Sequence, residues 1–131
     1  MTAVLKLKKR KDFLRVAKQG LKMVTSTVIL QAAQSFSVPY ETPKIGFTTT
    51  KKLGKAHIRN RARRRMRAAL HDYYHLLNPN IEYVLIGRYN TADCPFEKLR
   101  NDLSWGLKKL NKLFESNTDE QTLPKAADSA D

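Results

Sequence analysis

The chain has 131 residues, of which 41% are apolar, so it is long enough for one domain with a modest core. It carries a net charge of +13. Residues 115–131 hold five acidic side chains and one lysine, so the other residues carry +17, from 24 basic and 7 acidic side chains. This excess favours nucleic acid as the partner, with an anionic membrane surface as the alternative. We expect residues 1–114 to form the single domain and residues 115–131 to be an acidic, disordered tail.

Several other classes are excluded. No apolar run approaches the roughly 20 residues that a membrane-spanning helix needs, and no apolar stretch of signal-peptide length follows Met1–Arg10. No lipidation signal is visible. We therefore expect a cytoplasmic protein. Cys94 is the only cysteine, which excludes an intrachain disulfide and a zinc site built from several cysteines.

The beginning of the chain predicts a helix followed by a strand. Phe13, Val16 and Ala17 form the apolar stripe of a helix over Lys9–Gln19. The β-branched residues that follow predict a strand over Lys22–Ala33.

The middle of the chain predicts a second strand and the main helix. Ser35–Pro43 contains two prolines and is a connection or a short edge strand, whereas alternation in Lys44–Thr50 predicts a strand. After a basic loop over Lys51–Lys55, apolar residues at helical spacing predict a helix over Ala56–Leu77, ended by Asn78-Pro79-Asn80. The apolar face of this helix comprises Ile58, Ala62, Ala69, Leu70, Tyr73 and Leu77.

The last elements complete an α+β pattern. The apolar centre of Glu82–Arg88 predicts a strand buried on both faces, and Pro95 starts an amphipathic helix. The order is helix, two or three strands, helix, strand, helix, which is typical of an α+β sandwich with helices packed on a small sheet. For the strand–helix–strand unit over residues 44–88, the general rule predicts a right-handed connection.

The segment Lys51–Arg67 is the strongest functional signal. It reads K-K-L-G-K-A-H-I-R-N-R-A-R-R-R-M-R and holds nine Lys or Arg with no Asp or Glu. These cations repel one another unless a partner supplies negative charge, as a phosphate backbone does. A solvated charged face is the alternative, but such faces usually interleave acidic with basic residues. We therefore predict that this segment binds nucleic acid.

The cations of this segment form rows on a helical wheel. Arg59, Arg63 and Arg67 share one ridge, while the pairs Arg61 with Arg65 and Asn60 with Arg64 lie further round. Guanidinium groups grip phosphate and stack on bases, which suits RNA, and the start of the helix adds a positive dipole. The predicted RNA-binding residues are Lys51, Lys52, Lys55, Arg59, Asn60, Arg61, Arg63, Arg64, Arg65 and Arg67.

This segment resembles the signature of the bacterial ribonuclease P protein component, in which a Lys-Lys pair and a Gly precede Arg-Asn-Arg and further arginines. The likeness continues in Lys11-Asp12-Phe13 with Gly20, in Lys44-Ile45-Gly46-Phe47, and in Tyr83-Val84-Leu85-Ile86 with Arg88. It spans about residues 5–114.

The resemblance implies a small sandwich of helices on a mixed four-stranded sheet, in the order α-β-β-β-α-β-α, with a left-handed crossover in its strand–helix–strand unit. It implies a protein subunit that binds the catalytic RNA of ribonuclease P and the 5′ leader of precursor tRNA, and that assists endonucleolytic removal of the leader. The active site and its Mg²⁺ ions would belong to the RNA, with no catalytic residue or metal site in the protein. Membrane and DNA are not expected partners.

The resemblance also assigns residues by position. The RNA-binding signature would contain Arg59, Asn60, Arg61, Arg64 and Arg65. The leader cleft would contain Phe13, Gln31, Thr48, Lys52, Arg59, Arg63 and Arg67. Aromatic stacking holds single strands with little regard to sequence. Because Ala17 and Gln31 stand where the family often has aromatic residues, we expect leader binding here to rely more on charge and hydrogen bonds.

The chain offers little for chemistry of its own. Its acidic residues before position 115 are widely spaced, and His71 and His75 have a zinc-like spacing without an evident third ligand, so a surface or packing role fits them better. A non-catalytic RNA-binding protein, such as a ribosomal protein or an RNA chaperone, is the alternative function. DNA binding is less favoured, because the basic helix must also pack on the core and offers only Asn60 for reading bases.

Overall fold

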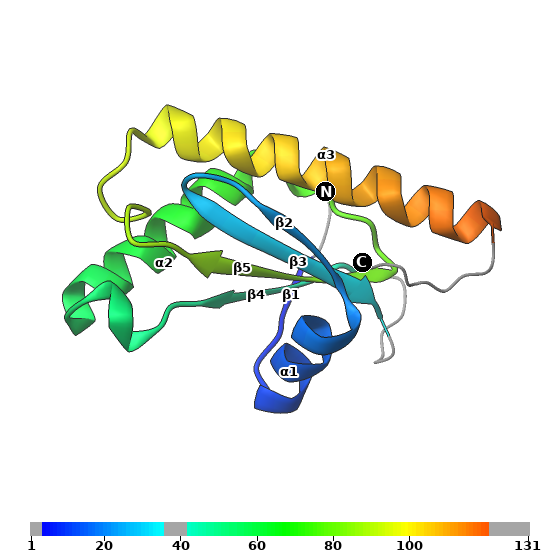
Figure 1. The fold of residues 1–131 in the computed structure, drawn as a ribbon, viewed down its shortest axis with the longest axis horizontal. Helices are drawn as coiled ribbons and strands as arrows, with labels where there is room; N and C mark the ends of the chain where they lie inside the picture. Colours follow the sequence, from blue (N-terminus) through cyan, green and yellow to red (C-terminus); the bar gives the residue numbers. More distant parts are fainter. Residues whose placement is uncertain (1–3, 36–41, 121–131) are drawn as a thin grey trace.

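The computed structural model describes residues 4–35 and 42–120, of which 116–120 by their backbone alone. The chain is an α+β sandwich of helices on a mixed sheet, as predicted, and the helices lie on both faces of the sheet (Figure 1). Its strands are β1 (Leu5–Lys6), β2 (Leu21–Val24), β3 (Val28–Gln34), β4 (Lys44–Thr48) and β5 (Ile81–Gly87). Its helices are α1 (Arg10–Gln19), α2 (Ala56–His71) and α3 (Phe96–Glu120), with short 3-10 helices η1 (Lys51–Leu53) and η2 (Tyr74–Leu76). Most of Ser35–Pro43 and the end of the acidic tail, residues 121–131, lie outside the described residues.

The sheet has five strands in the order β1-β4-β5-β3-β2. Strands β1, β4 and β5 are parallel, whereas β3 and β2 are antiparallel to their neighbours. The prediction of four strands is therefore wrong, because Leu5 and Lys6 pair with Lys44 and Ile45 as an additional edge strand. Two residues are too few to show an alternating pattern, so this strand is defined by its partner.

The single strand predicted over Lys22–Ala33 is a hairpin formed by β2 and β3. At the turn, Thr25 Oγ1 donates a hydrogen bond to the carbonyl oxygen of Val28 (2.6 Å) and accepts one from the Val28 amide (3.0 Å). A threonine hydroxyl that bonds to nearby backbone favours a turn. The β-branched residues of this segment predicted one continuous strand, whereas the hydroxyl of Thr25 stabilises a turn within it.

Helices α2 and α3 cover one face of the sheet and enclose the main core. The fully buried sheet residues Leu30, Tyr83 and Leu85 pack against α2 and against the buried leucines of α3. Helix α3 approaches β3 closely at Gly106, where a Cβ atom would lie 2.7 Å from Leu30 Cδ1. A larger residue at this position would force either the buried Leu30 side chain or the helix to shift.

Helix α2 ends at His71, earlier than the predicted Leu77. A tighter turn follows, in which the Tyr73 amide bonds to the carbonyl of Leu70 (2.8 Å) and the chain continues into η2. Tyr73 and Leu77 still pack on the core, as their place in the apolar stripe predicted. The stripe also contains the fully buried Met66, which the prediction omitted.

Helix α1 covers part of the opposite face. Its buried Val16 packs with Leu7, Ala33 and Val84, and the half-buried Phe13 lies at the margin of this cluster. The ring of Phe13 rests on β4 at Gly46, where a Cβ atom would lie 2.6 Å from two ring carbons. The absence of a side chain at Gly46 therefore allows the Phe13 ring to approach the strand this closely.

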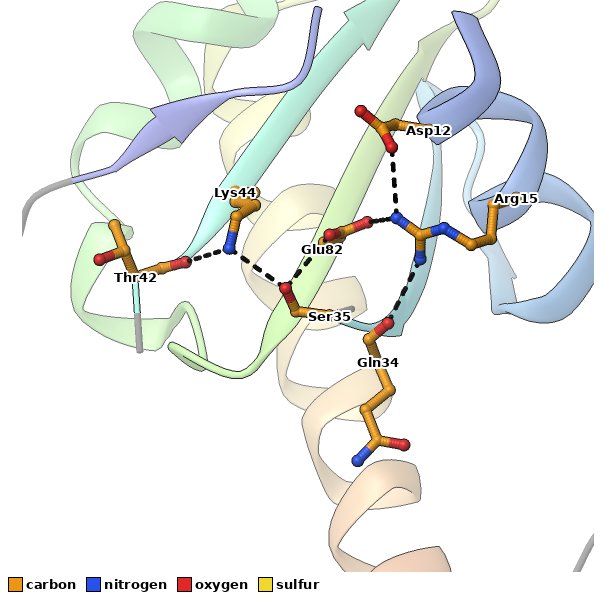
Figure 2. A network of polar contacts seen from close by, with 7 residues as sticks. All are labelled: Asp12, Arg15, Gln34, Ser35, Thr42, Lys44 and Glu82. Atoms are coloured by element: carbon orange, nitrogen blue, oxygen red, sulfur yellow. Dashed lines mark hydrogen bonds and ion pairs between the residues drawn. The ribbon is translucent and has the colours of Figure 1, made fainter. Parts of the chain in front are cut away.

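A network of polar side chains beneath α1 fixes this helix to the sheet (Figure 2). Glu82 is fully buried, forms an ion pair with Arg15 and accepts a hydrogen bond from Ser35 Oγ (3.1 Å). Lys44 Nζ donates to the same Ser35 oxygen (3.1 Å), and Arg15 donates to the carbonyl oxygen of Gln34 (3.4 Å). A buried carboxylate is tolerated when it is paired and hydrogen-bonded in this way. The network joins α1 to the ends of β3, β4 and β5.

We predict that Glu82→Gln lowers the free energy of unfolding by about 3 kcal/mol or more, because it leaves the partly buried Arg15 without its buried counter-charge. The measurement is urea denaturation followed by circular dichroism. Glu97→Gln is the matched control, since the Glu97 side chain is 73% exposed and lies 3.7 Å from Arg100. Its unfolding free energy should change by less than about 0.5 kcal/mol. Equal losses in the two variants would contradict a dominant role for the buried network.

Candidate nucleic-acid interface

The basic segment begins at a turn that only glycine adopts readily. Strand β4 leads through η1 to Gly54, which has a φ of 130°. Lys51, Lys52 and Lys55 are exposed around this turn, and the N-cap residue Lys55 makes no side-chain capping hydrogen bond to α2. The positive end of the helix dipole therefore lies beside three lysines, a suitable arrangement for binding phosphate.

Along α2, the arginines form the rows that the helical wheel predicted. The row Arg59, Arg63 and Arg67 turns toward β4 and the segment that follows it. Arg63 donates to Thr49 Oγ1 (2.6 Å) and to Asn60, and the Arg67 guanidinium lies 5.3 Å from the centre of the Phe47 ring. Two of these cations are therefore oriented by the protein before any ligand arrives.

A second row turns toward the connection between β5 and α3. Arg61 forms an exposed ion pair with Asp93 (3.2 Å), whereas the half-buried Arg65 donates to the carbonyl oxygens of Ala92 (2.6 Å) and Cys94. Sequence reasoning assigned both arginines to RNA. In the structure Arg65 also stabilises the connection between β5 and α3, because its guanidinium donates hydrogen bonds to two backbone carbonyls of that connection.

The third row consists of Asn60 and Arg64, which are both exposed. They point away from the core formed by the buried Ala62, Met66 and Leu70 on the opposite side of the helix. Arg64 is therefore the α2 cation best placed to meet an external phosphate directly.

Beside α1, the sheet presents a surface that we call the open face. Strand pairing aligns its residues in two rows across the sheet. One row is Val24, Ile29, Ile86 and Thr48, and the other is Lys22, Gln31, Val84 and Gly46. In the second row, Val84 and Gly46 are buried under α1, so this row contributes only Lys22 and Gln31 to the open face. The structure thus brings Phe13, Gln31 and Thr48, three of the predicted cleft residues, to the same face. Val24 is 51% exposed there, and Ile29, Ile86, Gln31 and Thr48 are half-buried.

The predicted arginine ridge borders the open face without lying on it. Phe47 packs with the main core, on the α2 side of β4, so Arg67 lies across that strand from Thr48. Arg63 reaches Thr49, immediately after the end of β4. Sequence reasoning missed Val24, Ile29 and Ile86, because an unbroken apolar run does not show which residues face which side.

Within the described part of the chain, no group of three or more His, Cys, Asp or Glu side chains is placed to hold a metal ion. His71 and His75 are exposed, and Cys94 is a buried free thiol whose pKa is raised by burial. No helix among the described residues is both long and apolar enough to cross a membrane. What the site does offer is cations arranged for phosphate and flat apolar surface for bases.

Comparison with known proteins gives a consistent result. The family model described as Ribonuclease P matches residues 1–111. The ribonuclease P protein component of Paramagnetospirillum magneticum is 40% identical over 111 residues, which cover 82% of this chain and 84% of that protein. The corresponding protein of Gluconacetobacter diazotrophicus is 43% identical over 107 residues, covering 79% and 89%. The solved RNase P protein of Staphylococcus aureus has a TM-score of 0.67 at 25% identity, covering 79% of this chain and 93% of that one. The chain belongs to the ribonuclease P protein family.

Proposed function

We propose that the chain, as the protein subunit of ribonuclease P, binds its catalytic RNA and the 5′ leader of precursor tRNA, and so assists removal of the leader in the cytoplasm. The observation that carries this proposal is the cationic helix α2 beside the open face of the sheet. The relatives named ribonuclease P protein component do not favour a ribosomal protein or an RNA chaperone as the alternative. A left-handed β4–α2–β5 crossover, implied by the family resemblance, is part of the proposal.

The catalytic RNA would meet the outward cations of α2 and of the turn before it. Arg64 and Asn60 are exposed on the outer side of the helix, and Lys51, Lys52 and Lys55 surround its start. These groups donate hydrogen bonds and neutralise phosphate without reading bases. Arg61 would join them by exchanging its exposed pair with Asp93 for phosphate, while Arg65 keeps the adjacent connection in place.

The leader would lie on the open face, with Phe13 at one border and the cations Lys52, Arg59, Arg63 and Arg67 along the β4 border. Phe13 offers a ring for stacking, and Gln31 and Thr48 offer hydrogen bonds. The half-buried Ile29 and Ile86 add flat apolar contact between them. None of these contacts demands a particular base, which suits one protein that serves many leaders.

The family implies Mg²⁺, and the side chains that the structure describes do not fit it. Mg²⁺ prefers several oxygen ligands in octahedral geometry, and the described residues bring together no cluster of carboxylates. We therefore propose that the metal ions are held by the partner RNA and that the protein contributes binding and orientation.

We predict that the protein accelerates cleavage of precursor tRNA by the cognate catalytic RNA at low Mg²⁺, since its cations replace part of the screening that Mg²⁺ provides. The measurement is single-turnover cleavage with and without protein. Unchanged cleavage would contradict the proposal. So would cleavage by the protein alone.

We predict that Phe13→Ala weakens binding of precursor tRNA to the holoenzyme on the order of ten-fold, because a stacked base contributes roughly 1–3 kcal/mol. Mature tRNA, which lacks the leader, should bind as before. Leu14→Ala is the control on the same helix, since Leu14 is 54% exposed and is not part of the cluster around Phe13. Equal losses for precursor and mature tRNA would place the effect outside the leader site.

We predict that joint substitution of Arg59, Arg63 and Arg67 by alanine makes the dependence of log affinity on log salt shallower. The magnitude of its negative slope should fall by about 2, since each lost phosphate contact on a single strand removes roughly 0.7. The measurement is leader-RNA binding between low and moderate salt. Arg100→Ala is the control, because Arg100 already pairs with Asp72 (3.1 Å). A slope that stays the same in the triple variant would show that the ridge does not meet phosphate.

A further inference from the structure

The outer surface of α3 carries an aromatic residue among lysines. Four fully buried leucines, Leu99, Leu103, Leu107 and Leu110, face the sheet. The opposite side of the helix presents Lys98, Asn101, Trp105, Lys108, Lys109 and Lys112, all exposed, which we call the outer stripe. Figure 1 shows α3 and α1 on opposite sides of the sheet, so the outer stripe lies away from the open face.

Trp105 is unusual at the centre of such a surface. Its side chain is 48% exposed, although a tryptophan gains more from burial than most residues. The Lys109 amine lies 5.8 Å from the centre of its ring and holds the indole by a cation–π contact. The ring is therefore exposed and oriented, as a stacking platform for a base needs to be.

The charged side chains of α3 that follow Trp105, up to Glu115, have one sign, whereas Asp102, one turn before Trp105, is acidic and pairs with Lys98 (3.5 Å). No acidic residue occurs between Asp102 and Glu115, while this interval contains three lysines. Asp102 is itself engaged, because it accepts hydrogen bonds from Thr27 Oγ1 (2.7 Å) and Ser26 Oγ (3.2 Å). Burial raises the pKa of Asp102, but these hydrogen bonds and the charge of Lys98 outweigh it and hold the pKa below its ordinary value. Phosphates are thus the complementary partner of the outer stripe.

We propose that the outer stripe of α3 is a second RNA-binding surface, which takes single-stranded RNA by stacking a base on Trp105 and by pairing phosphates with Lys108, Lys109 and Lys112. It is distinct from α2 and the open face, and goes beyond the function proposed above. A lipid surface fits less well, because Trp105 is the one apolar residue of the outer stripe and membrane-surface helices present a whole apolar face.

The test uses the emission of Trp105, the only tryptophan of the chain. A short oligouridylate titrated into the full-length protein should quench this emission to saturation, and the quenching should weaken with salt. The variant with Arg59, Arg63 and Arg67 changed to alanine should retain the quenching, which separates this surface from the proposed leader site. Unchanged emission in both proteins would overturn the proposal. A response to anionic phospholipid vesicles without one to RNA would overturn it in favour of a lipid surface.

Affinity variants complete the test. In the background of the arginine-to-alanine variant, Trp105→Leu should lower the affinity for fluorescein-labelled oligouridylate roughly ten-fold, and Trp105→Phe should recover part of the loss because a ring remains. Lys109→Ala with Lys112→Ala should flatten the salt dependence. Leu113→Ala is the control, since Leu113 is 43% exposed on α3 outside the outer stripe. Equal affinity of the Trp105→Leu and Leu113→Ala variants would overturn the proposal.

Discussion

The ion pair between the buried carboxylate of Glu82 and Arg15 is the interaction on which the position of α1 on the sheet depends. A charge without access to water must be paired, and here the partner comes from α1. Arg15 therefore brings one particular face of α1 onto the ends of β3 and β5 (Figure 2). Phe13 on the same helix comes to rest on Gly46. Because α1 is held at this end, Val24 on the rest of that sheet face stays exposed, and Ile29 and Ile86 stay half-buried.

A second constraint acts on α2. This helix must pack on the core and also carry seven of the predicted RNA-binding side chains of Lys51–Arg67. The helix meets both demands because its buried side is narrow and partly built from small residues, such as Ala62 and Ala69. The repulsion that remains is reduced within the protein, since Arg65 is occupied by backbone carbonyls and Arg67 by the ring of Phe47. What the protein leaves unneutralised is mainly the exposed outer side, where an RNA partner would complete the charge balance.

Long helices with regularly spaced apolar residues could be predicted from the sequence. Short elements that form only through contacts with residues far away in the chain could not. The start of α2, its three rows of polar side chains and most of its apolar stripe follow from helical spacing alone. Strand β1 exists only through pairing with β4, and the turn after β2 depends on one threonine hydroxyl. Glu82 is the charged first residue of the strand predicted over Glu82–Arg88, and it precedes the apolar centre on which that prediction depends. Its burial depends on Arg15, which lies far away in the chain, so no local pattern reveals it.

The proposed leader site is poor in aromatic residues, and apolar area and charge would take the place of several rings in holding a single strand. The family resemblance implies further aromatic residues at two positions where this chain has Ala17 and Gln31. The row through Val24, Ile29 and Ile86 provides a flat, partly exposed apolar surface next to Phe13, and contact with such a surface releases water whatever the base. Binding energy would then come from area and from charge at the β4 border, in place of several stacked rings. Since both contributions ignore base identity, the substitutions at positions 17 and 31 are compatible with a broad range of leaders.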